Sequence, residues 1–345
     1  MKLKQKQVYM IKTGIKIFIL TFLSLIGLSC KYDSLGSKKA KELSDYKSTI
    51  FVPTLESSFD TEKNSIYCAT LLFAWNEIKE EIKEEIEIST RYRDLTLINN
   101  SKSHIGVLQD NEYSVSYDIT EDYITANAEF SKSLPFEIDL TGDLDNISFE
   151  KTQVQSFGVY GVDYERSNLV KILYYKDDDN FIISLQPKDK SHEIILIKRE
   201  FAFTSMQQVW KETERLLEEG DNEKQLSKTS WKYQFLSNDY LVIPKIEFNI
   251  KTNFKSIEGN TFSSGDNDYL IEGVTQRTAF CLNESGAKVQ SESKFTVCVD
   301  ETENVEEPTP KEMQFNKPFA ILLKRKDSRN PYFGLWVANT ELMIK

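Results

Sequence analysis

Apolar residues recur at helical spacing in two stretches of the chain, and these stretches predict two long helices. The first runs from Asn64 to Ile88, with Glu and Lys between the apolar positions, and predicts a helix of about six turns. Its inward positions are Leu71, Trp75, Ile78, Ile82 and Ile86. The second is expected to begin at a capping box of Thr204 and Gln207 and to end at Gly220. Its inward positions are Met206, Val209, Trp210, Leu216 and Leu217.

Short runs rich in β-branched and aromatic residues fill most of the remaining chain and predict strands. Turn-forming residues, such as those from Asp177 to Asn180, separate the runs. The runs are 113–117, 123–127, 169–175, 181–185, 194–197, 240–248 and 275–282. Because strands dominate and the helices are grouped early and in mid-chain, the pattern predicts an α+β fold rather than a parallel α/β sheet.

Length and charge narrow the classes of function. With 345 residues, 40% of them hydrophobic and 12% aromatic, the chain can bury a substantial core. Its net charge is -11, and the first 29 residues hold five lysines and no acid, so the remainder carries -16. Nucleic acid and anionic membrane surfaces would repel such a domain on average, so neither is an expected partner.

The amino-terminal stretch predicts export. Five lysines precede an apolar run from Ile17 to Leu28, which has the length of a signal-peptide core and is short for a membrane span. The run ends in Gly27-Leu28-Ser29-Cys30, which resembles a bacterial lipoprotein signal with Cys30 as the acylated residue. An ordinary signal peptide with an incidental Cys30 is the alternative. The predicted organisation is a signal peptide at 1–29, a polar tether at 30–58 and a folded domain at 59–345.

The remaining cysteines and histidines give no support to a metal or cofactor. Cys68, Cys281 and Cys298 stand in no CxxC spacing, and the chain has two histidines. Zinc and haem sites are therefore not predicted, and no cofactor is expected. An exported chain could oxidise one pair of these cysteines and leave an odd thiol.

Five stretches in the latter two thirds of the chain carry a family resemblance. The first four are Ile124 to Ala128, Pro135-Phe136, Ile243 to Ile246 and Phe254 to Ile257. The most specific is Met313 to Leu323, which reads Met-Gln-Phe-Asn-Lys-Pro-Phe-Ala-Ile-Leu-Leu. In this order they resemble the serpins, which trap proteases by inserting an exposed loop into their own sheet. The resemblance implies a serpin-like fold with large mixed or antiparallel sheets.

The resemblance also implies a hinge and a reactive loop. The hinge would comprise Glu284, Gly286 and Ala287, within a reactive-loop region of about 284–314. The candidate scissile positions, counted from either end of the loop, are Asp300, Glu301, Glu306 and Glu307. All four are acidic, so the expected partner is a protease that cuts after Glu or Asp. An acidic stretch with two prolines is also typical of a plain solvated loop.

Alternation after the hinge permits a strand. Counting every second residue from Ala287 gives a first set that is small or apolar near the hinge, and the residues between them form a second set that is mostly polar. A strand inserted into a buried sheet requires such alternation. The first set reads Ala287, Val289, Ser291, Ser293, Phe295 and Val297, and the second reads Lys288, Gln290, Glu292, Lys294, Thr296 and Cys298. The charged residues of the second set would slow insertion. Residues 287–298 are therefore either a mobile loop or a permanent strand of the sheet.

The chain also departs from the family pattern. The part before Ile124 is shorter than usual, so several helices that cover the main sheet are expected to be reduced or absent. A tryptophan near the top of the sheet is missing at the shortened stretch from Lys132 to Pro135, and Gln276 replaces a usual histidine.

Cys281 and Cys298 discriminate between the two forms of the loop. In a hairpin that turns near Gly286, position 281 faces about 291, so Cys298 would lie roughly 20 Å from Cys281. A disulfide between them is incompatible with full insertion, and both are predicted to be free thiols if the segment is inserted.

Two functions of different class follow. The first is a surface-anchored, monomeric protease inhibitor that acts as a suicide substrate at the bacterial cell envelope. The alternative is a non-inhibitory, serpin-like binding or scaffold lipoprotein with 287–298 permanently in the sheet. An enzyme is not predicted: Ser101, Ser103 and His104 stand together, but neither histidine has an orienting partner at a useful spacing.

Overall fold

Helices are few in this fold. The computed structural model describes residues 39–109, 112–119, 123–130, 132–142, 144–200, 203–287 and 309–345. Its α-helices are α1 (Thr70–Ile82), α2 (Arg93–Asn100), α3 (Tyr164–Ser167) and α4 (Met206–Lys224), and its 3₁₀ turns are η2 (Leu43–Asp45), η3 (Ser230–Tyr233) and η4 (Thr340–Leu342). Within these ranges, none of the helices has the length and apolar character needed to cross a membrane.

The main sheet is built around one long strand, β17 (Asn267–Leu282). On one edge β17 pairs in parallel with β6 (Tyr123–Phe130), and on the other it pairs antiparallel with β15 (Ile246–Asn253). The remaining members are β5 (Ser114–Ile119) beside β6, β1 (Lys41–Glu42) beside β15, and β16 (Thr261–Ser264) with β4 (Ile86–Ile88) at the start of β17. The parallel contact of β6 with β17 matters most for function.

A second seven-stranded sheet forms the centre of the core. Its order is β11 (Val170–Asp177), β12 (Asn180–Leu185), β13 (His192–Lys198), β20 (Phe319–Arg325), β21 (Phe333–Val337), β3 (Asn64–Cys68) and β2 (Thr49–Val52). Every residue of β20, β21 and β3 is buried. Both faces of these strands are therefore covered, which explains the near-continuous apolar sequences of β21 and of β20 up to Leu323.

Three small sheets connect the two large ones. The first joins β10 (Ser156–Tyr160), β14 (Tyr240–Pro244) and β19 (Glu312–Gln314), the second joins β7 (Leu134–Pro135) and β18 (Gly286–Ala287), and the third joins β8 (Ile147–Phe149) and β9 (Thr152–Val154). The first two of these sheets hold the two ends of the chain segment between residues 287 and 309.

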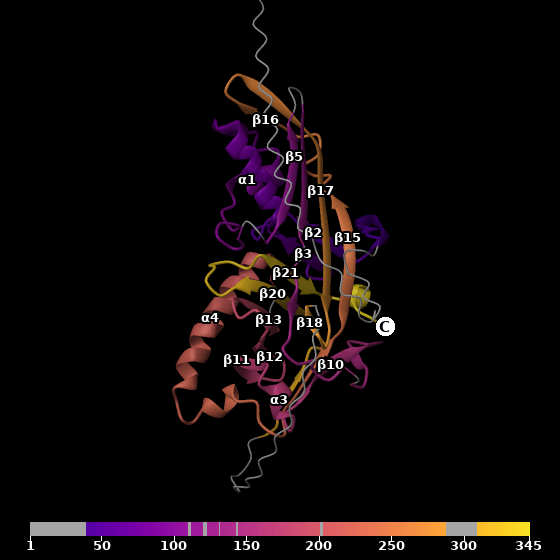
Figure 1. Ribbon diagram of the computed structural model, residues 1–345, viewed down its shortest axis with the longest axis vertical. Helices are drawn as coiled ribbons and strands as arrows, with labels where there is room; N and C mark the ends of the chain where they lie inside the picture. Colours follow the sequence, from indigo (N-terminus) through magenta and orange to yellow (C-terminus); the bar gives the residue numbers. More distant parts are fainter. Residues whose placement is uncertain are drawn as a thin grey trace, which may run out of the picture. The chain divides into compact units, whose positions relative to one another are not determined.

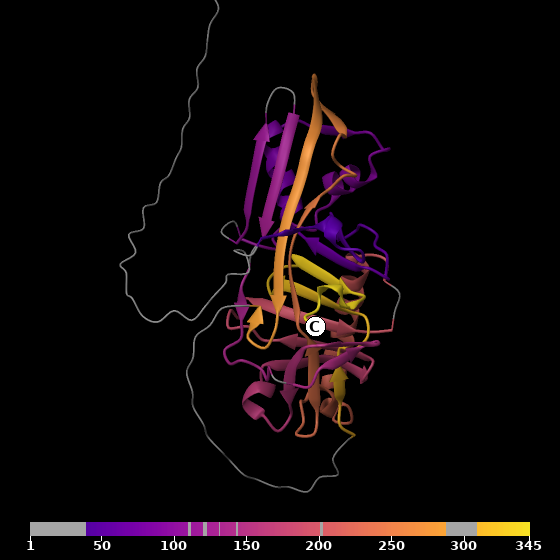
Figure 2. The same cartoon turned by 90° about the vertical axis from the view of Figure 1, so that its right-hand side faces the viewer.

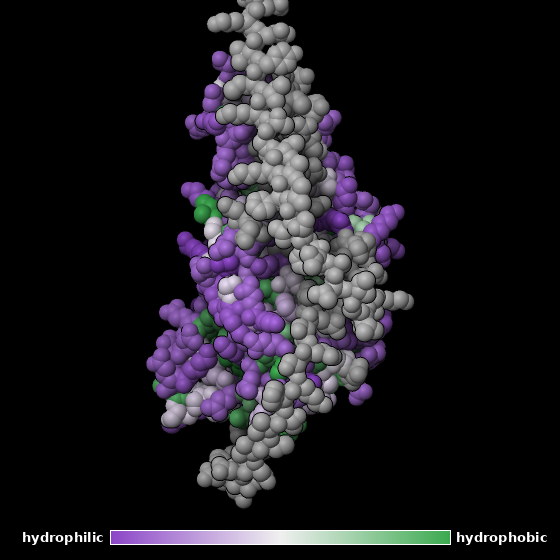
Figure 3. Space-filling view, viewed as in Figure 1, coloured by the Kyte–Doolittle hydropathy of each residue, from purple (hydrophilic) through white to green (hydrophobic). Residues whose placement is uncertain are grey.

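The two faces of the main sheet differ. Along β17, Val274, Gln276 and Thr278 are buried, whereas the alternate Thr275 and Arg277 are half-buried. Helix α1 lies against β5 and β6 on the buried side, as Figure 1 shows. Figure 2 faces the other side, where the strands stand in front and α1 lies behind them, and none of α1–α4 in the described chain covers this side. The side seen in Figure 3 is mostly hydrophilic over the described residues.

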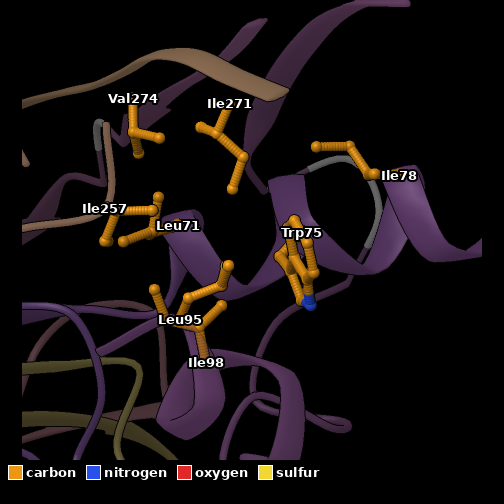
Figure 4. Close-up of a pocket in the computed structure, with 8 residues that line it drawn as sticks. All are labelled: Leu71, Trp75, Ile78, Leu95, Ile98, Ile257, Ile271 and Val274. Carbon is orange, nitrogen blue, oxygen red and sulfur yellow. The ribbon is translucent and has the colours of Figure 1, made fainter. Parts of the chain in front are cut away.

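An apolar cavity between α1, α2 and β17 is too small to hold a ligand. Figure 4 shows its lining, which consists of Leu71, Trp75, Ile78, Leu95, Ile98, Ile257, Ile271 and Val274. Its volume for a water-sized probe is 20 Å³, little more than the space of one water. The cavity therefore belongs to the packing of the helices on the sheet.

The predicted α+β class is confirmed, and most strand-like runs are strands at nearly the predicted positions. The predicted helix from Asn64 to Ile88 is wrong at both ends, because Asn64–Cys68 is the buried strand β3 and Ile86–Ile88 is β4. The helix ends at Lys83, whose φ of 60° is left-handed.

Two further boundaries need correction. Helix α4 is capped by Ser205, which accepts a hydrogen bond from Gln208 N, and it continues past Gly220 to Lys224. A Cβ at Gly220 would lie 2.2 Å from Leu173 O, so this glycine allows a close approach of two backbones and does not end the helix. The domain also begins before residue 59, because β1 and β2 pair with β15 and β3.

Candidate functional site

The site begins where β6 and β17 lie side by side. They share eight registered pairs, from Leu270 opposite Tyr123 to Thr278 opposite Phe130. On its other edge β17 pairs with β15 from Thr275 to Leu282. Both edges of β17 are therefore occupied from Thr275 to Thr278. Residues 288–298, which the alternative function places permanently in the sheet, lie outside the described residues.

The hinge follows β17 directly and is held by the segment after β7. Leu140 N donates to Glu284 O at 2.8 Å, and Phe136 N donates to Ser285 O at 3.1 Å. The Glu284 carboxylate lies 2.8 Å from Lys245 Nζ, at the junction of β14 and β15. Glu284 thus ties the hinge to the start of β15, the strand beside β17.

Gly286 allows the hinge to turn. Its φ is +95°, and its N–H donates to Asn283 O at 3.0 Å in a tight turn. A Cβ there would lie 2.7 Å from Leu134 O and Phe136 N, both backbone atoms of the strand that pairs with β18. Any side chain would push β18 away from β7, so this turn requires a glycine.

The far end of the loop region is held by a buried ion pair. Lys311 Nζ lies 2.7 Å from Asp239 Oδ2, and both side chains are at most 1% exposed. Lys311 N also donates to Asp239 Oδ1 at 2.7 Å. The rings of Trp231 and Tyr175 lie 5.2 and 5.8 Å from the ammonium group. This contact fixes the start of β19 against β14.

A cluster of charged and hydrogen-bonded side chains surrounds Glu112, close to the end of β6. Glu112 forms ion pairs with Lys132, which follows β6, and with Arg325 at 3.2 Å. Its carboxylate accepts a hydrogen bond from His192 Nε2 at 3.0 Å, and Tyr332 OH donates to His192 Nδ1 at 3.1 Å. The group joins the β5–β6 hairpin to the central sheet.

Burial and pairing shift the pKa values in this group. Burial works to raise the pKa of Glu112, but the hydrogen bonds from Lys132 and from Gln109 N outweigh it and lower this pKa to about 2. Burial lowers the pKa of His192, and Lys132 lowers it further. Glu112 is therefore ionised and His192 neutral at pH 7.

Acid is expected to destabilise the fold through its two histidines. Burial lowers the pKa of His104 to about 4, and that of His192 also falls below 6.5. A group whose folded pKa is depressed stabilises the fold above its unfolded pKa, and that stability is lost as the pH falls. For His104 the loss between pH 7 and 5 is about 2 kcal/mol. Denaturant titrations should show this fall, and His104→Phe should reduce it; an unchanged slope would contradict the assignment.

Ser101, Ser103 and His104 do not form a nucleophile and base. Ser101 Oγ donates to Glu56 at 3.0 Å and lies 2.8 Å from Ser103 Oγ. His104 Nδ1 has no hydrogen-bond partner among the described atoms, and all three side chains are buried. The cluster thus offers no accessible nucleophile.

The remaining predicted residues are placed as follows. The structure brings Glu284 and Gly286 together in the hinge, with the backbone of Ala287 in β18. Cys281 is buried in β17 opposite Glu247, and Gln276 donates to Thr278 within the same strand. Cys30, Cys298 and the four candidate scissile positions, Asp300, Glu301, Glu306 and Glu307, lie outside the described residues.

Several contacts that position the site were not predicted. These are Lys245 with Glu284, Asp239 with Lys311, and the group around Glu112. Each joins residues far apart in the chain, and no local pattern indicates the pairing. The one available signal was Lys311, a charged residue just before the stretch from Met313 to Leu323 that carries the family resemblance.

The comparisons with known proteins give structural similarities alone. No protein-family model and no curated protein matches the chain. Similar solved structures are Serpin48 of the insect Tenebrio molitor (15% identity, 63% of this chain and 56% of that chain, TM-score 0.36), Serpin-12 of Manduca sexta (14%, 65% and 57%, 0.37) and the serpin of Schistosoma mansoni (12%, 84% and 73%, 0.38).

The chain is thus similar to serpins, as its sequence predicts, and it spans less than two thirds of the length of the first two of these structures. The identities lie below 25% and the TM-scores below 0.5. What this chain inhibits or binds therefore has to be argued from its own residues.

Proposed function

We propose that this chain is a serpin-type protease inhibitor, held at the bacterial cell envelope by a lipid on Cys30, that acts as a suicide substrate. The bait is the acidic stretch from Val299 to Pro310, which follows the hinge and precedes β19. A monomer suffices for this mechanism, and no cofactor takes part in it.

The observation that supports the proposal is the parallel pairing of β6 and β17. A chain that turns back after β17 runs antiparallel to β17, and therefore also antiparallel to β6. Such a strand can enter between them and replace one parallel ladder with two antiparallel ladders. Antiparallel pairing is somewhat more stable per residue, and the sheet also gains one complete ladder. The closed sheet can therefore store free energy that insertion releases.

The arrangement of helices agrees with insertion. The open side of the main sheet carries none of the described α-helices, so a strand entering between β6 and β17 displaces no such cover (Figure 2). The hinge can turn at Gly286, and the residues after it alternate between small and polar. The loop end at Lys311 stays fixed, which leaves the hinge end free to move.

The chemistry of the trap comes from the protease. Its serine or cysteine attacks the carbonyl carbon after an acidic loop residue, the peptide bond breaks, and the new amino group leaves with the β19 side of the chain. The hinge side stays attached to the protease as an acyl ester or thioester. Insertion then carries the acyl-enzyme along the sheet and distorts its catalytic site before water can hydrolyse it.

Acidic residues at the scissile positions determine the class of protease. Asp300, Glu301, Glu306 and Glu307 are the candidates, and each requires a basic specificity pocket. The alternative, a non-inhibitory scaffold, differs from this proposal in that its residues 287–298 would not move; the direct pairing of β6 with β17 favours the inhibitor, because it leaves a ladder that insertion can open.

The test is incubation of the full chain with a glutamyl endopeptidase. We expect a covalent adduct that survives denaturing electrophoresis, together with slower turnover of a peptide substrate. Simple cleavage with neither adduct nor inhibition would exclude a suicide mechanism against this class of protease. Mass spectrometry of the released carboxyl-terminal fragment would identify the scissile bond.

A further inference from the structure

Three large side chains are exposed within five residues of the chain. Tyr160, Val162 and Tyr164 are 50%, 67% and 67% exposed. Among the described residues, the other large apolar side chains with comparable exposure are Ile105, Leu226 and Leu270, which lie in separate segments. A concentrated group of this kind is typical of an interaction surface.

This surface, Tyr160 to Tyr164, lies between the two ends of the loop region. On one side, Tyr160 pairs with Tyr240 of β14, and Tyr240 pairs with Glu312 of β19. On the other side, Arg166 Nε donates to Asp139 O at 2.7 Å, and the next residue, Leu140, donates to Glu284 O at 2.8 Å. The surface therefore lies beside both described ends of the chain segment that the proposed function assigns to the protease.

The segment is held firmly, although its side chains point outward. Gly161 N donates to Asp239 O at 2.7 Å, and a Cβ at Gly161 would lie 1.7 Å from Leu236 O. Asp163 accepts from Arg166 N and forms an ion pair with its guanidinium at 2.6 Å. A rigid apolar surface loses little conformational entropy on binding, so it is well suited to hold a partner.

The charges around the surface indicate the partner. Of the charged residues beside it, Asp163 is paired with Arg166, which leaves the negative charge of Glu165, and the sequence between the two loop ends is itself acidic. A basic protein surface complements this arrangement, whereas an anionic membrane would be repelled. A protease that cuts after Glu or Asp needs positive charge at its substrate cleft, so its rim has the required sign.

We propose that Tyr160, Val162 and Tyr164 form a second contact site for the target protease, outside the scissile segment. This inference rests on the proposed function. The apolar side chains would pack against the rim of the protease while the loop occupies its cleft. The contact then adds affinity to the first encounter complex and selects among proteases that share the same specificity pocket.

The test compares three full-length proteins with a glutamyl endopeptidase as the probe. They are the wild type, the triple variant Tyr160→Ser/Val162→Ser/Tyr164→Ser, and Ile105→Ser, a matched loss of one exposed side chain elsewhere. We expect the second-order rate of adduct formation to fall about tenfold or more in the triple variant and to stay unchanged in Ile105→Ser. The thermal midpoints of all three should agree, which excludes a folding defect.

Two failures can be told apart. If the wild type forms no adduct, the proposed function and this inference fall together. If the wild type and the triple variant form adducts at the same rate, the inference alone is wrong. Weaker binding of the triple variant than of the wild type to vesicles of phosphatidylethanolamine and phosphatidylglycerol would assign the surface to the membrane and would also overturn it.

Discussion

Cleavage of the chain within residues 288–308 should raise the midpoint of its thermal unfolding by about 10 to 20 °C. Cleavage frees the hinge side of the loop to enter between β6 and β17, which share eight pairs in the closed sheet. An inserted strand of about eight residues adds one ladder of hydrogen bonds, each with a net contribution of about 1 kcal/mol. For a chain of this size, each kcal/mol moves the midpoint by about 2 °C. Differential scanning calorimetry before and after limited proteolysis measures the shift.

Two matched variants separate insertion from simple nicking. Ser291 has the parity that would face the core, and Gln290 has the parity that would face the open side of the sheet. Ser291→Arg would bury an unpaired charge on insertion and should abolish the rise. Gln290→Arg adds the same charge on the open side and should preserve it. Because both cleaved variants contain the same break in the chain, a difference between their midpoints reports insertion and not the break itself.

A midpoint that stays within a few degrees after complete cleavage would contradict stored strain in the closed sheet. The chain would then be cut as an ordinary substrate, and its sheet would be stable without a further strand. Equal rises in Ser291→Arg and Gln290→Arg would contradict insertion, because an inserted strand must place one of the two arginines against the core. A rise lost only in Gln290→Arg would contradict the assigned parity.

The sequence predicted the strands well because their signals are local. The stretch from Phe181 to Leu185 is bounded by turn residues, and it forms β12 at that position. The same reasoning failed for Asn64 to Cys68. β3 is buried on both faces, and its apolar residues, Ile66 to Cys68, are consecutive and run directly into those of helix α1, so no alternation marked the strand.

The site was predictable only in outline. Gly286 could be placed at the hinge because a glycine at a turn after a strand is a local signal. Lys245 and Glu284 could not be paired, since their contact depends on how β15 and β17 meet. The same applies to Glu112, which meets His192 and Arg325 only once the β5–β6 hairpin docks on the central sheet.

Lys311→Met should destabilise the fold by about 3 kcal/mol. It leaves the Asp239 carboxylate, which is 1% exposed, without its counter-charge, although Lys311 N and Leu236 N still donate to it. It also removes the cation from the rings of Trp231 and Tyr175. Urea titration measures the loss. The control is Lys317→Met. Lys317 forms an ion pair with Asp179 in which the two side chains are 47% and 39% exposed, so this substitution should cost less than about 1 kcal/mol.

The double variant Lys311→Met/Asp239→Asn completes the argument, because it removes the unpaired charge and keeps an acceptor for the backbone donors. It should recover part of the stability that Lys311→Met loses, as coupled sites do. If Lys311→Met costs no more than Lys317→Met, the buried pair does not anchor β19. The start of β19 could then separate from β14, with which it pairs. This would weaken the proposed mechanism, because a suicide substrate needs the β19 end of its loop to be held while the hinge end moves.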